Sequence, residues 1–292
     1  MITALDHIAI VVADLDAAVA NYERFLGRKA NWRGHYLGAD HAWLQLPNVA
    51  LNLLSPTGPG QIGDEVRSRL EAAGEGLWAV AFTVADLDLY VSEATRRGVK
   101  VGAPSVLNST QANGAIRTWR LCDADITTTA GVEIVLVDRP RASWPTSEPL
   151  VSEASAVSAL DHVVINTPNP DRAVALYGAR LGLDFRLERS NPAWGSKLMF
   201  FRCGGTVVEI VAALNGALSP DAPDHLSGLA WRVSDPHAAQ ARLVEAGLDV
   251  SEVRTGRKPG TRVFTIRSGV PGAPTLMLST DPISTQDERE TA

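Results

Sequence analysis

The chain carries the sequence LDHIAIVVADLDAAVANYERFLG at residues 5–27 and LDHVVINTPNPDRAVALYGARLG at residues 160–182. The two stretches align without a gap at an offset of 155 residues, and 11 of their 23 positions are identical. Repetition at a fixed spacing is the signature of a duplicated structural unit. The sequence therefore predicts two related halves.

Each half contains a second, weaker copy of the same unit, beginning near Ala81 in the first half and near Ala230 in the second. Every unit opens with an apolar β-branched run, which is followed by a helical pattern that ends at a glycine. Three short strand-like runs separated by turn residues come next. The residues expected to cap the four helices are Asp14, Asp86, Asn169 and Asp235. The pattern predicts four βαβββ units.

Four such units, with Leu-Asp-His opening two of them and Val-Glu-Ile in a late strand of two, resemble the vicinal oxygen chelate superfamily. That superfamily includes glyoxalase I, methylmalonyl-CoA epimerase, extradiol dioxygenases, fosfomycin-resistance enzymes and bleomycin-binding proteins. The resemblance implies an α+β fold in which paired βαβββ modules form two glyoxalase-like domains. Each domain is then a cupped mixed sheet around a cavity, with the helices outside.

The duplication sets the expected domain boundaries at residues 1–138 and 159–280. Residues 139–158 are rich in Pro, Ser and Ala without a period and are expected to be a linker. The polar residues 281–292 are expected to form a flexible tail. We expect neither the linker nor the tail to carry chemistry.

Composition narrows the range of partners and compartments. The 292 residues carry a formal net charge of -6 and no Lys/Arg run, which argues against nucleic acid or an anionic membrane as a partner. Cys122 and Cys203 form no CxxC pair, and no apolar stretch resembles a signal or a membrane span. We expect a cytoplasmic monomer or homodimer that takes a small-molecule substrate.

The resemblance implies four metal-ligand positions per cavity, two of them in each of its two units. In the first cavity these positions hold His7, Asn52, Ala79 and Glu133, and in the second they hold His162, Glu209, Gly228 and Thr275. Each cavity thus offers one imidazole and one carboxylate as metal ligands. A divalent ion such as Zn, Fe, Mn or Ni, or no metal at all, is compatible with so few donors.

Strand parity predicts further side chains inside the cavities. In residues 41–46 the even positions are apolar and should face the helices, which leaves His41, Trp43 and Gln45 facing the first cavity. With Asn52 they are expected to bind substrate, and His41 is a candidate third ligand that makes the first cavity the better metal site. Arg232 is expected to face the second cavity, either holding a substrate carboxylate or enolate or pairing with Glu209.

The two glutamates are the expected catalytic groups. Glu133 and Glu209 lie among Val, Ile and Leu, where an unpaired carboxylate is costly to bury, so a partner or a proton-transfer role is expected. For each histidine, a structural role in a strand remains the alternative to ligation. The leading hypothesis is a glyoxalase-like metalloenzyme, a lyase or isomerase that moves a proton on a small oxygenated substrate.

Two alternatives stay open. An extradiol-type dioxygenase resembles a two-His-one-carboxylate site, but Ala79 and Gly228 stand where the second histidine would be. A metal-free binding or antibiotic-resistance protein would stack its ligand on tryptophan. The sequence contains no GxSxG motif, which argues against a hydrolase with a serine nucleophile. Residues 58–63, GPGQIG, lack the Lys-Ser/Thr of a phosphate loop, and we expect no strand-to-helix turn there.

Overall fold

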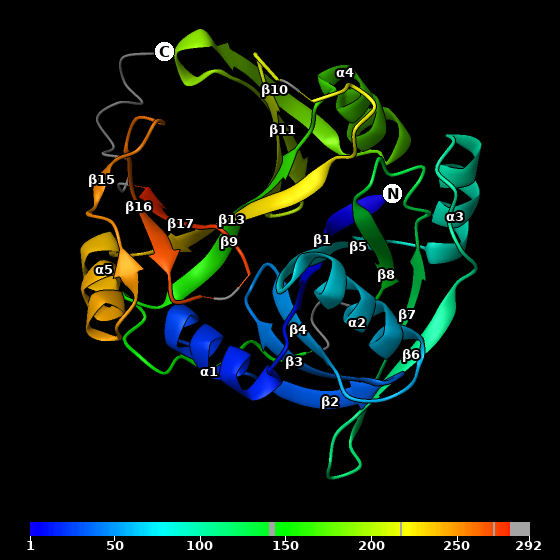
Figure 1. Cartoon of the computed structure of the whole chain (residues 1–292), viewed down its shortest axis with the longest axis horizontal. Helices are drawn as coiled ribbons and strands as arrows, with labels where there is room; N and C mark the ends of the chain where they lie inside the picture. Colours follow the sequence, from blue (N-terminus) through cyan, green and yellow to red (C-terminus); the bar gives the residue numbers. More distant parts are fainter. Residues whose placement is uncertain (140–143, 217, 271, 281–292) are drawn as a thin grey trace.

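The two halves of the chain form two β-sheets that lie side by side in the computed structural model (Figure 1). The structure describes residues 1–139, 144–216, 218–270 and 272–280. The expected tail, residues 281–292, and residues 140–143 of the expected linker lie outside the described residues. The α+β class and the pairing of four βαβββ modules into two sheets are confirmed.

The first sheet is a closed barrel of eight strands, in the order β1-β4-β3-β2-β6-β7-β8-β5. Its central strands β1 and β5 run antiparallel, while β4 and β8 add to them in parallel. The strands are β1 (Ile2–Val11), β2 (Trp32–Tyr36), β3 (Ala39–Gln45), β4 (Ala50–Pro56), β5 (Gly76–Val84), β6 (Ser105–Thr110), β7 (Ile116–Asp123) and β8 (Glu133–Asp138).

The second sheet repeats this order as β10-β11-β12-β9-β13-β17-β16-β14, with β15 paired to β16. Its ends do not meet, so it is an open cup, whereas the pairing of His35 in β2 with Thr110 in β6 closes the first sheet. The strands are β9 (Val157–Asn166), β10 (Asp184–Asn191), β11 (Ser196–Cys203), β12 (Thr206–Ala213), β13 (His225–Val233), β14 (Asp249–Val250), β15 (Arg254–Thr255), β16 (Thr261–Ser268) and β17 (Thr275–Thr280).

The helices begin where the cap residues predict. The side chains of Asp14, Asp86, Asn169 and Asp235 each accept a hydrogen bond from an amide of the first turn. Helix α4 continues as a π-helix over Val174–Arg180. The α-helices are α1 (Leu15–Leu26), α2 (Gln61–Ala73), α3 (Leu87–Arg96), α4 (Pro170–Ala173) and α5 (Pro236–Glu245). None of the described helices is long and apolar enough to cross a membrane.

One hydrophobic core runs through both domains. The ring of Phe25 in α1 stands edge-on to Trp231 in β13, with 6.1 Å between the ring centroids. The hydroxyl of Tyr90 in α3 donates to the carbonyl of Leu181, beyond the π-helix, at 2.9 Å. Because helices of the first domain pack on the second, the two sheets are fixed against each other (Figure 1).

Helix α2 has no helical counterpart among the described residues of the second domain and closes part of the barrel interior. It follows β4 directly, so the strand-to-helix turn that we did not expect at residues 58–63 is present. Val66 of α2 is fully buried in the aromatic cluster inside the barrel. The helix approaches the chain closely at Gly63, where an added Cβ would lie 2.2 Å from the carbonyl oxygen of Gly38.

This contact predicts that Gly63→Ala destabilises the first domain. A methyl group 2.2 Å from a backbone oxygen forces α2 away from the barrel, which we expect to cost about 1–3 kcal/mol. Chemical denaturation monitored by tryptophan fluorescence measures the loss. Gly58→Ala is the matched control, because nothing lies within 4 Å of its added Cβ. Equal stability of the two variants would show that α2 does not pack as described.

Candidate functional site

A β-bulge places an aspartate beside the repeated histidine in each domain. In β1 the register shifts between Leu5 and His7, so Asp6 has no partner in β5. In β9 the pairing likewise skips Asp161. In a regular strand, neighbouring side chains point to opposite faces, and the bulge removes that alternation at the aspartate. In both domains the aspartate carboxylate lies within 2.8 Å of the histidine Nδ1.

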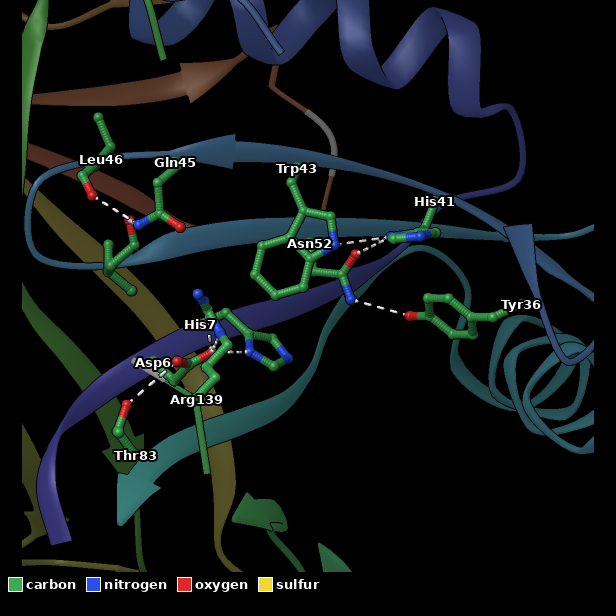
Figure 2. A network of polar contacts seen from close by, with 11 residues as sticks. Asp6, His7, Tyr36, His41, Trp43, Gln45, Leu46, Asn52, Thr83 and Arg139 are labelled. Atoms are coloured by element: carbon green, nitrogen blue, oxygen red, sulfur yellow. Dashed lines mark hydrogen bonds and ion pairs between the residues drawn. The ribbon is translucent and has the colours of Figure 1, made fainter. Parts of the chain in front are cut away.

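In the first barrel this aspartate anchors a buried ion pair (Figure 2). Nε and Nη2 of Arg139 donate to Asp6 Oδ1 at 3.2 and 2.9 Å, and the Thr83 hydroxyl donates to Oδ2 at 3.2 Å. Burial alone would raise the pKa of Asp6, but the contacts with His7 and Arg139 outweigh it and hold the pKa below its usual value. Asp6 therefore remains ionised and orients His7.

His41 lies inside the barrel but is engaged in hydrogen bonds (Figure 2). Trp43 Nε1 donates to its Nδ1 at 2.8 Å, so the proton resides on Nε2, which donates to Ser109 Oγ at 2.6 Å. Burial lowers the pKa of His41 to about 3. Asn52 contacts His41 Nδ1 and the Tyr36 hydroxyl, both at 3.2 Å. The network argues against His41 and Asn52 as additional ligands.

Two further residues expected to bind substrate in the first barrel, Trp43 and Gln45, are also held by contacts within the protein. Trp43 is almost fully buried among aromatic rings, and the Gln45 amide donates to the carbonyls of Leu46 and Val49 at 2.8 and 3.3 Å. Glu133 shares the face of His7 but stands two strands away, because β5 lies between β1 and β8. Burial, and then the charges of Asp123 and Glu65, raise the pKa of Glu133.

The segment between the domains, expected to be a linker, packs side chains into the first barrel. Its Trp144 ring stands 5.1 and 5.4 Å from the rings of Trp43 and Trp119. The guanidinium carbons of Arg139 and Arg117 lie 4.0 and 4.6 Å from the Trp144 ring centroid. The segment therefore fills the barrel with an aromatic side chain and a cation.

The second cup aligns four polar side chains in one chain of contacts. Arg232 Nε donates to Asp161 Oδ1 at 2.7 Å, and Asp161 Oδ2 lies 2.8 Å from His162 Nδ1. His162 Nε2 lies 3.1 Å from Glu209 Oε2. Arg232 thus pairs with Asp161, and the alternative pairing with Glu209 is not observed. The predicted His162 and Glu209 are in direct contact.

Burial and charge tune this chain of contacts. Burial raises the pKa of Glu209, and the opposing charges of His162 and Arg257 do not fully cancel the effect. Burial also acts to raise the pKa of Asp161, but His162 and Arg232 outweigh it and leave the pKa below its usual value. The site therefore combines a carboxylate that stays ionised with one that holds its proton more tightly.

A pocket of about 380 Å³ lies at the end of the cup, and none of the four side chains in this chain of contacts lines it. Its walls include Asn166 of β9 and Val211 of β12, which face the cup on the same strands as His162 and Glu209. Across the cup, the guanidinium carbon of Arg257 lies 4.9 Å from the ring centroid of Trp194. Thr275 pairs with Leu229, whereas the next residue of that strand, Ala230, pairs with His162 on the cup face. Thr275 therefore lies on the opposite face of the sheet, and its hydroxyl donates to the carbonyl of Ala273. It is not a cavity residue as the alignment suggested.

Several residues of these sites were missed in the sequence. Arg117 and Trp119 alternate on β7 with the parity of interior positions, a signal that could have placed both inside the barrel. Arg139 and Trp144 lie where composition indicates a linker, and no local pattern shows that they turn inward. Arg257 and Trp194 meet only because the cup curves.

The sequence matches the family model of the Glyoxalase/Bleomycin resistance protein/Dioxygenase superfamily twice, over residues 6–114 and 161–265. The chain belongs to this superfamily, in which the sequence analysis placed it by resemblance. Comparison with curated protein sequences finds no match.

Two solved structures resemble the fold along most of the chain. A mutant of 4-hydroxymandelate synthase from Streptomyces coelicolor gives a TM-score of 0.69 at 14% identity and covers 99% of this chain and 96% of its own. The Mn(II)-bound glyoxalase from Novosphingobium aromaticivorans gives 0.66 at 17% identity, covering 95% and 82%. At such identities the likeness concerns the two-domain fold and leaves the reaction open.

We expect substitution of the two bulge aspartates, Asp6 and Asp161, to lower the free energy of unfolding by different amounts. Asp6 and Arg139 expose 0% and 3% of their side chains, whereas Asp161 and Arg232 expose 25% and 44%. Asp6→Asn leaves a buried guanidinium without its counter-charge, which we expect to cost about 3–5 kcal/mol at pH 7. Asp161→Asn, the matched control, should cost about 1 kcal/mol or less. Urea denaturation measures both.

The deficit of Asp6→Asn should also depend on pH. Because the folded-state pKa of Asp6 is lowered, its stabilisation is complete above the unfolded-state value near 3.8 and is lost as the pH falls through the folded value. The difference from wild type should therefore persist from pH 7 to about 5 and shrink below about 4. A constant difference down to pH 2 would contradict the ionised state assigned to Asp6.

Proposed function

We propose that the second cup is an acid–base site that moves a proton on a small oxygenated, anionic substrate. The observation that carries this proposal is the chain of contacts from Arg232 through Asp161 and His162 to Glu209. Such a chain connects a solvent-accessible cation to a half-buried carboxylate through an imidazole. Lyase and isomerase reactions next to a carbonyl require this proton transfer.

The contacts fix the state of His162. Asp161 is ionised and accepts a hydrogen bond from Nδ1–H, so Nε2 is the ring atom that faces Glu209. Nε2 lies 3.1 Å from Glu209 Oε2, so the imidazole is in direct contact with the carboxylate. The raised pKa of Glu209 makes this carboxylate a stronger base than an exposed one. Ionised Glu209 takes the proton from the carbon next to the substrate carbonyl and becomes a neutral acid, and the negative charge left on the substrate's enolate oxygen pairs with Arg232.

Arg232 and the pocket would orient the substrate. The Nε of Arg232 is bound to Asp161, and its partly exposed guanidinium end can pair with a substrate carboxylate or enolate oxygen. The pocket lies further along β12, at Val211 and Ala213, and its lining also includes Asn166 and Ser196. A substrate with its carbonyl at Glu209 thus has a cation on one side and room for its carbon skeleton on the other.

The side chains of the cup do not fit a resident metal ion. His162 and Glu209 supply two donors, and no group of three or more His, Cys, Asp or Glu that could hold a metal exists among the described residues. Catalytic metal sites of the zinc type use three protein ligands, and the two-His-one-carboxylate site of a dioxygenase also needs three. We therefore derive no step through a metal.

Hydrogen exchange tests the proposed function directly. Incubation with pyruvate or phenylpyruvate in D₂O, followed by ¹H NMR, detects removal of the proton next to the carbonyl. We expect wild type to catalyse exchange and Glu209→Gln to lower the rate by about 10²–10⁴-fold with little change in KM, because Gln keeps the shape and lacks the basicity. Glu252→Gln on the exposed surface is the control.

Three results would contradict the proposal. Wild type that exchanges neither probe would exclude this substrate class, and exchange lost in Glu133→Gln but kept in Glu209→Gln would move the site to the first barrel. Exchange that is abolished by dialysis against EDTA and restored by Mn²⁺ would show that a metal completes the site.

A further inference from the structure

The interior of the first barrel holds two arginines around one tryptophan ring. Arg117 of β7 and Arg139, which follows β8, both lie over Trp144, and Arg117 also lies 4.1 Å from the ring centroid of Trp32. Their guanidinium groups approach from strands on neighbouring parts of the barrel wall. The cluster lies in the first domain and takes no part in the acid–base site proposed for the second cup.

The charges of this cluster are not balanced. Asp6 neutralises Arg139, but no described carboxylate lies within ion-pair distance of Arg117. Burial, and then the charge of Arg139, lower the pKa of Arg117 to about 10, so it remains a cation at neutral pH. The barrel interior around Trp144 therefore carries one excess positive charge, since burial also keeps His41 neutral.

Both arginines also have hydrogen-bond donors without acceptors. Nη1 of Arg117 and Nη1 of Arg139 are buried and find no partner among the described residues. An unsatisfied buried donor costs about 1–3 kcal/mol, and more when it is charged. The same defect on two adjacent guanidinium groups is what an anion with two acceptor oxygens would repair.

Trp144 itself is held by few polar contacts. No described hydrogen bond involves its indole nitrogen, so the ring is retained by stacking on the two guanidinium groups and by its edges against Trp43 and Trp119. The backbone beyond it is fixed separately, because Ser147 exchanges hydrogen bonds with Gln45. The contacts that hold the Trp144 ring are therefore separate from those that hold the backbone at Ser147.

We propose that the first barrel is a binding site for a small planar aromatic carboxylate, and that Trp144 occupies the place of the ligand's ring. The ligand ring lies between the guanidinium groups and the edges of Trp43 and Trp119. Its carboxylate accepts hydrogen bonds from Nη1 of Arg117 and Nη1 of Arg139. A neutral aromatic molecule leaves both donors unsatisfied and binds less well.

Calorimetric titration of Trp144→Ala tests the site. The probe is indole-3-acetate, which has the ring of the removed side chain and a carboxylate, and the matched neutral probe is 3-methylindole. We expect Trp144→Ala to bind indole-3-acetate at least tenfold more tightly than it binds 3-methylindole, and more tightly than wild type does. Adding Arg117→Met should weaken indole-3-acetate at least tenfold and leave 3-methylindole unchanged.

Trp144→Val serves if the alanine variant does not fold, because its side chain keeps part of the apolar packing and leaves most of the ring's place free, and it should show the same preference for the carboxylate. Binding of both probes with equal affinity, or an affinity for indole-3-acetate that survives Arg117→Met, would overturn the proposal and leave the cluster as internal packing. Adding Glu209→Gln to Trp144→Ala should not change indole-3-acetate binding. A loss there would locate the probe in the second cup and also overturn the proposal.

Discussion

The β-bulge in the first strand of each domain is the constraint on which both sites depend. A regular strand would direct Asp6 and Asp161 to the helix side, where an ionised carboxylate has no partner. The bulge turns each aspartate toward the same space as the histidine that follows it. It thereby fixes the imidazole through Nδ1 and gives an arginine from elsewhere in the domain a carboxylate to bind.

The same motif has different consequences because burial differs. In the first barrel the aspartate and its arginine are almost completely enclosed, and the ion pair holds the end of β8 to β1. In the second cup the pair is partly exposed, and the histidine reaches a glutamate across the strand. Desolvation makes the first pair a structural anchor and leaves the second available to a ligand.

Closure of the sheet accounts for this difference in burial. Both sheets have the same strand order, but only the first is closed by a β2–β6 pair, and helix α2 and Trp144 then fill its interior. The second sheet ends at β10 and β14 and keeps a pocket at the end of the cup, where β12 contributes Val211. Duplication has therefore produced one packed barrel with a cationic aromatic cluster and one open cup with an acid–base chain.

The sequence by itself determined the duplication, the four βαβββ units and the helix starts, because caps and strand periodicity are local properties of the chain. It also identified His7, His162, Glu133 and Glu209 as inward-facing. Only the tertiary structure decided that His162 meets Glu209 whereas β5 separates His7 from Glu133. The bulge at Asp6, the inward turn of Trp144 and the pairing of Arg139 depend on contacts between residues from about 25 to 133 positions apart, which no local pattern encodes.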